Sequence, residues 1–388
     1  MSEPHRPSLR RALEGCLGVH FTEGNIVERL RNGVQIFPAM LEAIEGAERT
    51  VDMLTFIYWQ GDIATRVAEA LADRARAGCR VRLVLDYFGA RLLEDDLVEM
   101  MEDAGVHVHW FRPVNGVTDV ADAGERTHRK VLIVDERVAF VGGVGIAEEW
   151  EGDAREPGEW RDDHFRITGP AVDGLRSAFL DDWAESGQEL LDEHDRFPDP
   201  EVHDDGCPAL VVRGASEAGW SDIGLLKRVL CELAESEIRI TTAYFSPNEH
   251  MTRWLCEAVE RGVAVKVLMP GEHTDKRLPQ LDGEQMYERL LECGVEIHRY
   301  DLTMLHAKVM TVDGHVADVG SANFNDRSVR WDEECDVVVL SEDLVAQLNA
   351  DFDEDLQHAT QVTLEEWRQR GPIQRAGEAV AGAIDRFV

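Results

Sequence analysis

The same order of predicted elements occurs twice in this chain of 388 residues, once over residues 33–135 and again over residues 218–313. Each copy begins with an amphipathic helix and then alternates strands with helices. Strands that alternate with helices of about 10–15 residues predict βαβ units. The predicted fold class is therefore α/β, with two duplicated α/β/α halves and mostly parallel mixed sheets. The predicted strands are 53–59, 79–86 and 104–111 in the first copy and 238–245, 263–270 and 293–300 in the second.

An acidic stretch that contains Pro198 and Pro200 separates the two copies. This composition favours a linker over a buried element. Apolar residues make up 44% of the chain, which is enough for a sizeable core, and the length suits two domains. The predicted division is an N-terminal tail (1–22), a first half (23–190), a linker (191–206), a second half (207–357) and a C-terminal helical tail (358–388).

The composition is strongly acidic, with 76 Asp and Glu against 40 Lys and Arg and a formal net charge of −36. A field of this sign repels the phosphate backbone of nucleic acids at ordinary salt, so no nucleic-acid partner is expected. Only five of the basic residues are lysine, at positions 130, 227, 266, 276 and 308. The composition fits either a protein that works at high ionic strength or an arginine-rich genome with an acidic bias.

The seven cysteines are scattered along the chain, and none forms a CxxC pair. This pattern favours a reduced, cytoplasmic protein in which most thiols are small core residues. The N-terminal segment has basic residues without an apolar stretch after them, and no apolar run reaches about 18 residues. We therefore expect neither a signal peptide nor a membrane anchor.

One chemical motif, HxKxxxxD, occurs once in each copy. Residues two apart in a strand face the same side, so the His and Lys of each motif point together. Two of the five lysines occupy these positions, which indicates a need for a compact point charge that arginine does not provide. A pair of such motifs indicates phosphodiester transfer. The motif residues are His128, Lys130 and Asp135 in the first copy and His306, Lys308 and Asp313 in the second.

With these two motifs the sequence resembles the phospholipase D superfamily, in which the motifs meet at a pseudo-twofold axis. The likeness extends from about residue 23 to residue 357, and the second copy has the longer form GSAN (320–323) followed by NDRS (325–328). The chain is most similar to the bacterial cardiolipin synthase branch, in its shorter members without N-terminal membrane spans. The resemblance implies one active site at the interface of the halves. The segments that carry the closer likeness are 32–44, 56–63, 128–150 and 160–172.

The resemblance implies a reaction that uses no metal and no other cofactor. Lys130 and Lys308 would neutralise the non-bridging oxygens of the phosphodiester. His128 would attack phosphorus and form a covalent phosphohistidine. His306 would protonate the leaving alkoxide and then deprotonate the incoming alcohol, unless the two histidines exchange these roles.

Several carboxylates are candidates for orienting the histidines. Asp135 and Asp313 of the motifs either orient the imidazoles, as an aspartate does in a serine-hydrolase triad, or hold the turn at the strand end. Asp332 and Glu334 lie where the family has Asn and Glu, and Glu149 is the comparable acid of the first half. For these three acids, the alternative to orienting the partner histidine is a solvated loop position.

Small and polar residues after each motif are candidates for binding the phosphate. Ser321 and Asn323 would donate hydrogen bonds in the second half, and Gly143 allows close approach in the first. Gly145 stands at the position where the family usually has Asn, which removes one donor and argues against a fully symmetric site. His164 lies on a predicted strand near the first motif and is interpreted as either a core residue or a supporting residue of the site.

The implied reaction converts two molecules of phosphatidylglycerol into cardiolipin and glycerol. The alternatives are a hydrolase that releases phosphatidic acid and a nuclease of the same superfamily, which the net charge disfavours. Two complete motifs disfavour a non-catalytic scaffold. A phospholipid substrate implies peripheral contact with a membrane, on the inner face of the cell membrane for a cytoplasmic protein. The sequence does not indicate the oligomeric state.

Two segments allow two interpretations each. The aromatic stretch 56–59 is either core or a contact for the acyl chains or head group. Residues 371–388 have apolar residues near helical spacing and follow Trp367. They form either an amphipathic helix on the membrane surface or a helix packed on the second half.

Overall fold

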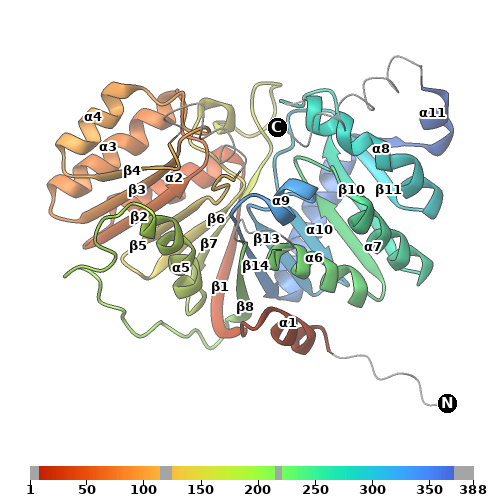
Figure 1. Cartoon of the computed structure of the whole chain (residues 1–388), viewed down its shortest axis with the longest axis horizontal. Helices are drawn as coiled ribbons and strands as arrows, with labels where there is room; N and C mark the ends of the chain where they lie inside the picture. The colour runs from red at the N-terminus through yellow and green to blue at the C-terminus, as the bar shows by residue number, and fades with distance from the viewer. Residues whose placement is uncertain (1–7, 114–124, 215–220, 276, 371–388) are drawn as a thin grey trace.

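The computed structural model describes residues 8–113, 125–214, 221–275 and 277–370. In these residues, fifteen strands form one sheet in the order β15-β11-β10-β9-β12-β13-β14-β8-β1-β7-β6-β5-β2-β3-β4 (Figure 1). The strands are β1 (Thr22–Arg31), β2 (Thr50–Thr55), β3 (Arg80–Asp86), β4 (His107–Phe111), β5 (Val131–Val134), β6 (Val138–Gly142), β7 (Asp163–Thr168), β8 (Cys207–Gly214), β9 (Glu237–Thr241), β10 (Ala264–Pro270), β11 (Glu296–Tyr300), β12 (Val309–Val312), β13 (Val316–Gly320), β14 (Glu334–Leu340) and β15 (Ala359–Val362).

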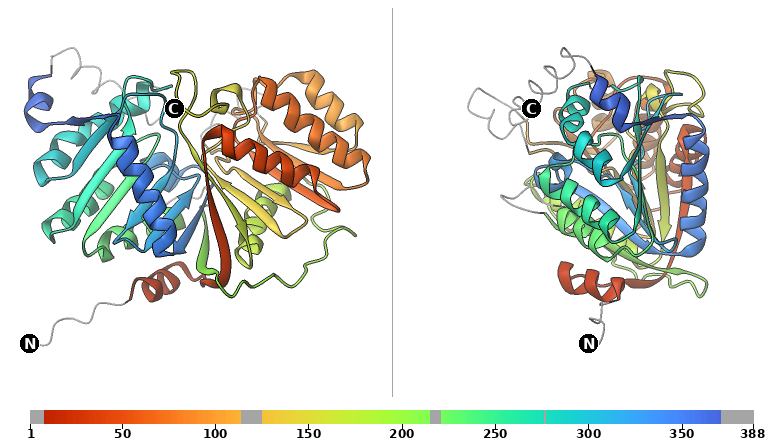
Figure 2. Two further views of the ribbon diagram at one scale, coloured as in Figure 1. Left: turned by 180° about the vertical axis from the view of Figure 1, so that it is seen from behind. Right: turned by 90° about the vertical axis from the view of Figure 1, so that its right-hand side faces the viewer.

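Helices cover both faces of this sheet (Figure 2). The predicted α/β fold of two duplicated halves is confirmed, because the order β8-β14-β13-β12-β9-β10-β11 mirrors the order β1-β7-β6-β5-β2-β3-β4. The helices are α1 (Leu9–Leu17), α2 (Asn32–Glu45), α3 (Asp62–Arg76), α4 (Asp95–Asp103), the 3-10 helix η2 (Glu148–Trp150), α5 (Ala171–Ala184), α6 (Asp222–Leu233), α7 (Glu249–Glu260), α8 (Arg277–Cys293), α9 (Asp326–Arg330), α10 (Glu342–Leu356) and α11 (Leu364–Gln369).

The sheet is mixed, but antiparallel pairs outnumber parallel pairs among the described strands, which differs from the mostly parallel arrangement that was expected. Parallel pairs join β3 to β2 and β4, and β10 to β9 and β11, as the βαβ pattern predicts. The strands that carry the HxKxxxxD motifs are β5 and β12. They pair antiparallel with β6 and β13, because a short hairpin connects the two strands of each pair. The first predicted strand, 53–59, begins and ends earlier than expected. After Thr55 the backbone leaves the ladder, and Tyr58 makes only an isolated bridge with Ile146.

The two halves share a core as well as a sheet. One apolar cluster lies under α2, α3 and α4, and another lies among α6, α7 and α8. A third cluster runs across both halves, joining Phe165 and Phe179 of the first half to Val319 and Val337 of the second. The sheet is also continuous through the pairing of β1 with β8. The predicted domain boundaries therefore stay a prediction, since neither core nor sheet is interrupted there.

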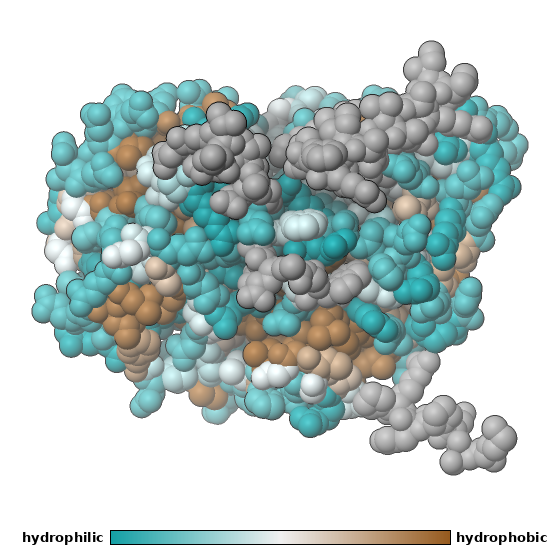
Figure 3. Space-filling model, viewed as in Figure 1, coloured by the Kyte–Doolittle hydropathy of each residue, from teal (hydrophilic) through white to brown (hydrophobic). Residues whose placement is uncertain are grey.

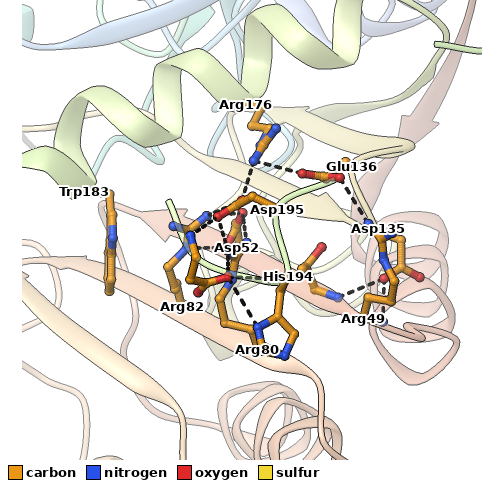
Figure 4. Close-up of polar contacts among 12 residues, drawn as sticks. Arg49, Asp52, Arg80, Arg82, Asp135, Glu136, Arg176, Trp183, His194 and Asp195 are labelled. Atoms are coloured by element: carbon orange, nitrogen blue, oxygen red, sulfur yellow. Dashed lines mark hydrogen bonds and ion pairs between the residues drawn. The ribbon is translucent and has the colours of Figure 1, made fainter. Parts of the chain in front are cut away.

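The predicted linker lies against β3 and α5 of the first half. The carboxylate of Asp195 is buried, with its side chain 2% exposed. It accepts hydrogen bonds from the guanidinium groups of Arg80 (2.8 Å) and Arg176, and those of Arg80 and Arg82 also bind Asp52 (Figure 4). Buried charges of both signs are thus paired, which is the condition under which proteins tolerate them.

Replacing Asp195 with alanine is expected to lower the free energy of unfolding by about 3 kcal/mol, because the substitution removes a carboxylate that the buried guanidinium groups of Arg80 and Arg176 share. Urea unfolding followed by tryptophan fluorescence measures the change. The matched control is Asp199→Ala in the same segment, where the side chain is exposed. Equal stability of the two variants would show that the linker charges do not hold the segment in place.

The cysteine pattern concealed one pair. Cys256 of α7 and Cys293 of α8 form a disulfide, with their Cα atoms 5.5 Å apart. Their separation of 37 residues is no recognisable motif, so the sequence gave no sign of the pairing, and the disulfide differs from the expectation of a reduced protein. Cys79, Cys231 and Cys335 are buried free thiols, in agreement with that expectation.

Both predicted tails contain ordered elements. Helix α1 packs against α6 of the second half, and β15 pairs with β11 at the outer edge of the sheet. Trp367 of α11 is buried against Tyr287, with ring centroids 5.3 Å apart. Residues 371–388, for which a helix was predicted, lie outside the described residues.

The visible face of the molecule is mostly hydrophilic, with separate apolar patches among the polar side chains (Figure 3). This distribution agrees with the formal net charge of −36. No helix in the part of the chain that the structure describes is long and apolar enough to cross a membrane.

Candidate active site

Both HxK segments lie at the boundary between the halves, immediately before β5 and β12. The backbone N–H of His128 donates to the carbonyl of Glu333 at 2.9 Å. The backbone N–H of His306 donates to the carbonyl of Arg161 at 2.7 Å. The first bond joins the motif of the first half to the segment before β14 of the second half. The other bond joins the motif of the second half to the segment before β7 of the first half. These main-chain bonds hold the two motifs beside each other.

The first histidine is oriented by a carboxylate of the second half. Nδ1 of His128 lies 3.0 and 3.1 Å from the two carboxylate oxygens of Glu334. Glu334 is fully buried, and it also accepts hydrogen bonds from the hydroxyls of Ser321 (2.5 Å) and Ser328 (2.6 Å). The predicted residue Glu334 therefore contacts the histidine, and Ser321 fixes the carboxylate.

The second histidine is oriented by a carboxylate of the first half. Nδ1 of His306 lies 2.8 Å from Oδ2 of Asp162, and this oxygen also accepts a hydrogen bond from the indole N–H of Trp150 at 2.8 Å. The two acids cross the interface in opposite directions. The site therefore consists of two histidine–carboxylate pairs, and each half supplies one member of each pair.

Asp162 was missed in the sequence, where Glu149 was named as the acid of the first half. The register of the strands, which only the structure shows, identifies the correct acid: Gly142 lies opposite His164, and Gly320 lies opposite Asp336. Counting back two residues from His164 and Asp336 makes Asp162 the counterpart of Glu334.

Glu149 and Asp332 do not contact a histidine through any described hydrogen bond. Glu149 lies in η2, where its backbone carbonyl accepts from the N–H of Trp160 and one carboxylate oxygen is buried without a partner among the described residues. Asp332 accepts from the guanidinium of Arg327 at 2.9 Å. The histidine-orienting position thus belongs to Asp162, while a substrate-binding role for Glu149 stays a prediction.

The two motif lysines lie in the same buried space. Nζ of Lys130 donates to the carbonyl of His128 at 2.7 Å, and Nζ of Lys308 donates to the carbonyl of His306 at 2.5 Å. Burial and the charge of Lys308 lower the pKa of Lys130 to about 7. Burial lowers the pKa of Lys308 to about 8. Two buried ammonium groups that act on each other's charge form a binding site for an anion.

The same environment acts on the histidine–carboxylate pair of the second motif. Burial, and after it the charge of Lys308, lowers the pKa of His306 to about 4. Burial alone would raise the pKa of Asp162, but His306 and Lys308 hold it at about 2. At neutral pH the carboxylate is therefore ionised, and the imidazole donates its Nδ1 proton to it.

The motif aspartates lie at the other end of the motif strands, away from the histidines. Asp135 accepts from the backbone N–H groups of Glu48, Arg49 and Thr50 at 2.8–2.9 Å. Asp313 accepts from the backbone of residues 235–237 at 2.7–3.0 Å. The structure thus does not bring them together with the histidines. Their contacts support the second of the two predicted roles, which is to hold the strand-end turn.

Asp135→Asn and Asp313→Asn are expected to lower the free energy of unfolding by about 2 kcal/mol each and to leave kcat within a few-fold, because each loses charge-assisted bonds to backbone amides. Burial raises the pKa of Asp313, but the backbone amides of residues 235–237 bring it below its usual range. This stabilisation is present above the unfolded pKa and is lost as the pH falls through the folded value. Thermal melts between pH 6 and pH 3 measure it, and a kcat loss above a hundredfold would contradict the structural role.

The small residues after the motifs are unequal in the two halves. A Cβ at Gly143 would lie 2.2 Å from a carboxylate oxygen of Asp162, so no side chain fits beside that acid. A Cβ at Gly145 would lie 2.7 Å from Cβ of Ile57, which explains why the usual Asn is absent. In the second half Asn323 is buried, with its side-chain oxygen 3.4 Å from the hydroxyl of Thr242.

Aromatic rings surround the two imidazoles. Phe56 packs edge-on against His128, with ring centroids 5.1 Å apart. The ring centroids of Trp150 and Trp160 each lie 5.2 Å from that of His306, and these rings shield the imidazole from solvent. The aromatic stretch 56–59 thus contributes both to the core and, through Phe56, to the wall of the site.

The fold and this paired site define a phosphodiester-transfer enzyme with two HxKxxxxD half-sites. Residues 40–150 and 230–356 match the family described as cardiolipin synthase, phospholipase D-like domain. The chain belongs to this family, and it is an enzyme of the phosphatidyltransferase class.

Relatives and solved structures agree with this assignment. The chain is 32% identical to the cardiolipin synthase of Geobacillus kaustophilus over 97% of its own length and 75% of that protein. It is 30% identical to cardiolipin synthase 1 of Bacillus anthracis over 90% of its own length and 70% of that protein. The crystal structure of phosphatidylserine synthase from Haemophilus influenzae has the same fold, with a TM-score of 0.73 at 14% identity over 98% of this chain and 97% of that one.

Proposed function

We propose that the protein is a cardiolipin synthase that converts two molecules of phosphatidylglycerol into cardiolipin and glycerol. The observation that carries the proposal is the crossed pair His128–Glu334 and His306–Asp162 with two lysines beside it. This arrangement supplies a nucleophile, a proton donor and two cations for one phosphodiester. The names of the relatives support the lipid substrate.

The proposed reaction has two steps, in which a phosphohistidine forms and its phosphatidyl group is then transferred to an alcohol. Nε2 of His128 attacks phosphorus, the bond from phosphorus to the glycerol oxygen breaks, and His306 gives its proton to that oxygen. The hydroxyl of the second phosphatidylglycerol then attacks the phosphohistidine, its proton passes to His306, and the N–P bond breaks. Glu334 and Asp162 hold the Nδ1 side of the two rings, which leaves Nε2 of His128 to face phosphorus and Nε2 of His306 to face the alcohol oxygen.

The buried lysines are matched to an anionic substrate. Without substrate they depress the pKa of His306, because their charges oppose its protonation. A phosphodiester anion between Lys130 and Lys308 neutralises that field and raises the pKa of the imidazole. Substrate binding thus prepares His306 to carry the proton that the first step requires.

The enzyme acts at a membrane surface because both substrates are membrane lipids. We propose peripheral contact on the inner face of the cell membrane. The net charge of −36 opposes approach to an anionic bilayer, so contact is expected to strengthen with salt that screens this repulsion.

Purified protein is tested on phosphatidylglycerol vesicles at low and high salt, with lipid products identified by mass spectrometry. Cardiolipin with an equal amount of glycerol is the expected result. Phosphatidic acid as the sole product would establish a hydrolase. Cleavage of plasmid DNA without lipid turnover would replace the proposal with a nuclease.

The pH dependence of kcat/KM is expected to follow the two lysines. Since the pKa values of Lys130 and Lys308 lie at about 7 and about 8, the charged forms predominate below these values and disappear above them. The phosphodiester stays anionic throughout, so kcat/KM is expected to fall at least about tenfold between pH 7 and pH 9. Initial rates across this range measure the pH profile. The control is Lys266→Met on β10, which is expected to keep the wild-type profile. A constant kcat/KM up to pH 9.5 would contradict the lowered pKa values of the two lysines.

A further inference from the structure

The two halves of the site differ at one equivalent position. The register of β2 with β5 and of β9 with β12 makes Ile57 and Tyr244 counterparts. The local hydrogen bonds agree: the hydroxyl of Thr55 donates to the carbonyl of Ile57, and the hydroxyl of Thr242 donates to the carbonyl of Tyr244. The chain therefore places an aliphatic side chain in one half and a phenol in the other.

On the His128 side of the site, this position is apolar. Phe56 packs on the ring of His128, and Nζ of Lys130 lies 5.3 Å from the centroid of the same phenyl ring. Ile57 fills the space beside Gly145 that a polar side chain would otherwise occupy. Neither Phe56 nor Ile57 has a side-chain group that can bond to a polyol hydroxyl.

On the His306 side, the equivalent position has a phenol hydroxyl that is bonded to an exposed carboxylate. The ring of Tyr244 packs edge-on against His306, with centroids 6.2 Å apart. Its hydroxyl donates to the carboxylate of Asp275, 2.8 and 2.9 Å from the two oxygens. Asp275 is exposed, yet it lies close enough to Lys308 to act on its charge. A phenol hydroxyl and an exposed carboxylate thus lie beside the imidazole that handles the alcohol proton.

We propose that Tyr244 and Asp275 form the alcohol subsite, which binds the second hydroxyl of a vicinal diol such as glycerol or a glycerol head group. The inference rests on the proposed function and adds the residues that recognise the acceptor. A carboxylate accepts from the hydroxyl next to the reacting one, while His306 takes the proton of the reacting hydroxyl. Water and simple alcohols have no second hydroxyl to bind, so the subsite favours transfer to a diol over hydrolysis.

The test compares two alcohols that differ in this second hydroxyl. Wild-type protein, Tyr244→Phe and Asp275→Asn are given phosphatidylglycerol vesicles with either ¹³C-glycerol or methanol. Mass spectrometry measures labelled phosphatidylglycerol, phosphatidylmethanol, phosphatidic acid and cardiolipin. Both variants are expected to need about tenfold more glycerol for half-maximal exchange, as loss of one bond to a charged group predicts. The ratio of glycerol transfer to methanol transfer is therefore expected to fall about tenfold in both variants.

Matched controls remove a phenol and a carboxylate elsewhere. Tyr87→Phe and Asp96→Asn are expected to keep the wild-type ratio of glycerol to methanol transfer. An unchanged ratio in Tyr244→Phe and Asp275→Asn would overturn the subsite, as would an equal loss with both alcohols. A wild-type protein that forms neither labelled phosphatidylglycerol nor cardiolipin would instead overturn the proposed function itself.

Discussion

Replacing His128 with alanine is expected to lower kcat by about 10⁴-fold or more, because no other group can form the covalent intermediate. His306→Ala is expected to lower kcat by about 10²–10⁴-fold with phosphatidylglycerol, because the glycerol alkoxide must leave without a proton. The two variants separate when the leaving group is p-nitrophenolate, which needs no proton. His306→Ala should then release one nitrophenolate per enzyme in a burst and accumulate a phosphohistidine, whereas His128→Ala should show no burst.

The control for these variants is His315→Ala, an exposed histidine in the turn after the second motif. It is expected to keep wild-type rates with both substrates. A burst from His128→Ala but not from His306→Ala would reverse the assigned roles. Full turnover of phosphatidylglycerol by either variant would exclude a paired site.

The second large effect is expected at the crossed carboxylates. Glu334→Gln and Asp162→Asn keep the shape of each side chain but put a neutral amide against Nδ1 of the histidine. We expect kcat to fall by about 10²–10⁴-fold in each variant, since the imidazole loses both its orientation and the charge that stabilises its protonated form. Steady-state rates of cardiolipin formation measure the loss, and thermal melts show whether the variants fold.

Glu149→Gln distinguishes this arrangement from the one predicted by sequence. The carboxylate of Glu149 makes no described bond to His306, so its removal is expected to change kcat by less than about fivefold. A larger effect from Glu149→Gln than from Asp162→Asn would mean that the working site differs from the geometry described here.

The sequence predicted most of what repeats in this protein. The duplicated order of elements predicted two mirrored α/β halves, and the two lysines in an arginine-rich chain pointed to the motifs. These features are local, because periodicity and spacing within one half determine them. Glu334 was also found, because it could be compared with a family position.

The contacts between halves could not be predicted in the same way. Asp162 follows another acid-rich run and has no fixed spacing from His306, and only the register of β7 and β14 makes it the counterpart of Glu334. Gly145 was seen as a departure, but its reason is the side chain of Ile57, which is distant in sequence. The disulfide between Cys256 and Cys293 likewise depends on how α7 and α8 pack.

The crossing of the carboxylates also constrains how such a protein can arise and change. A single half would contain a histidine without its acid and an acid without its histidine, so it could complete a site only as a twofold dimer. Joining two copies in one chain removes the dependence on protein concentration and lets the halves diverge. This divergence is limited, because each half carries the carboxylate that orients the histidine of the other half. Loss of that carboxylate from one half would disable the histidine of the other.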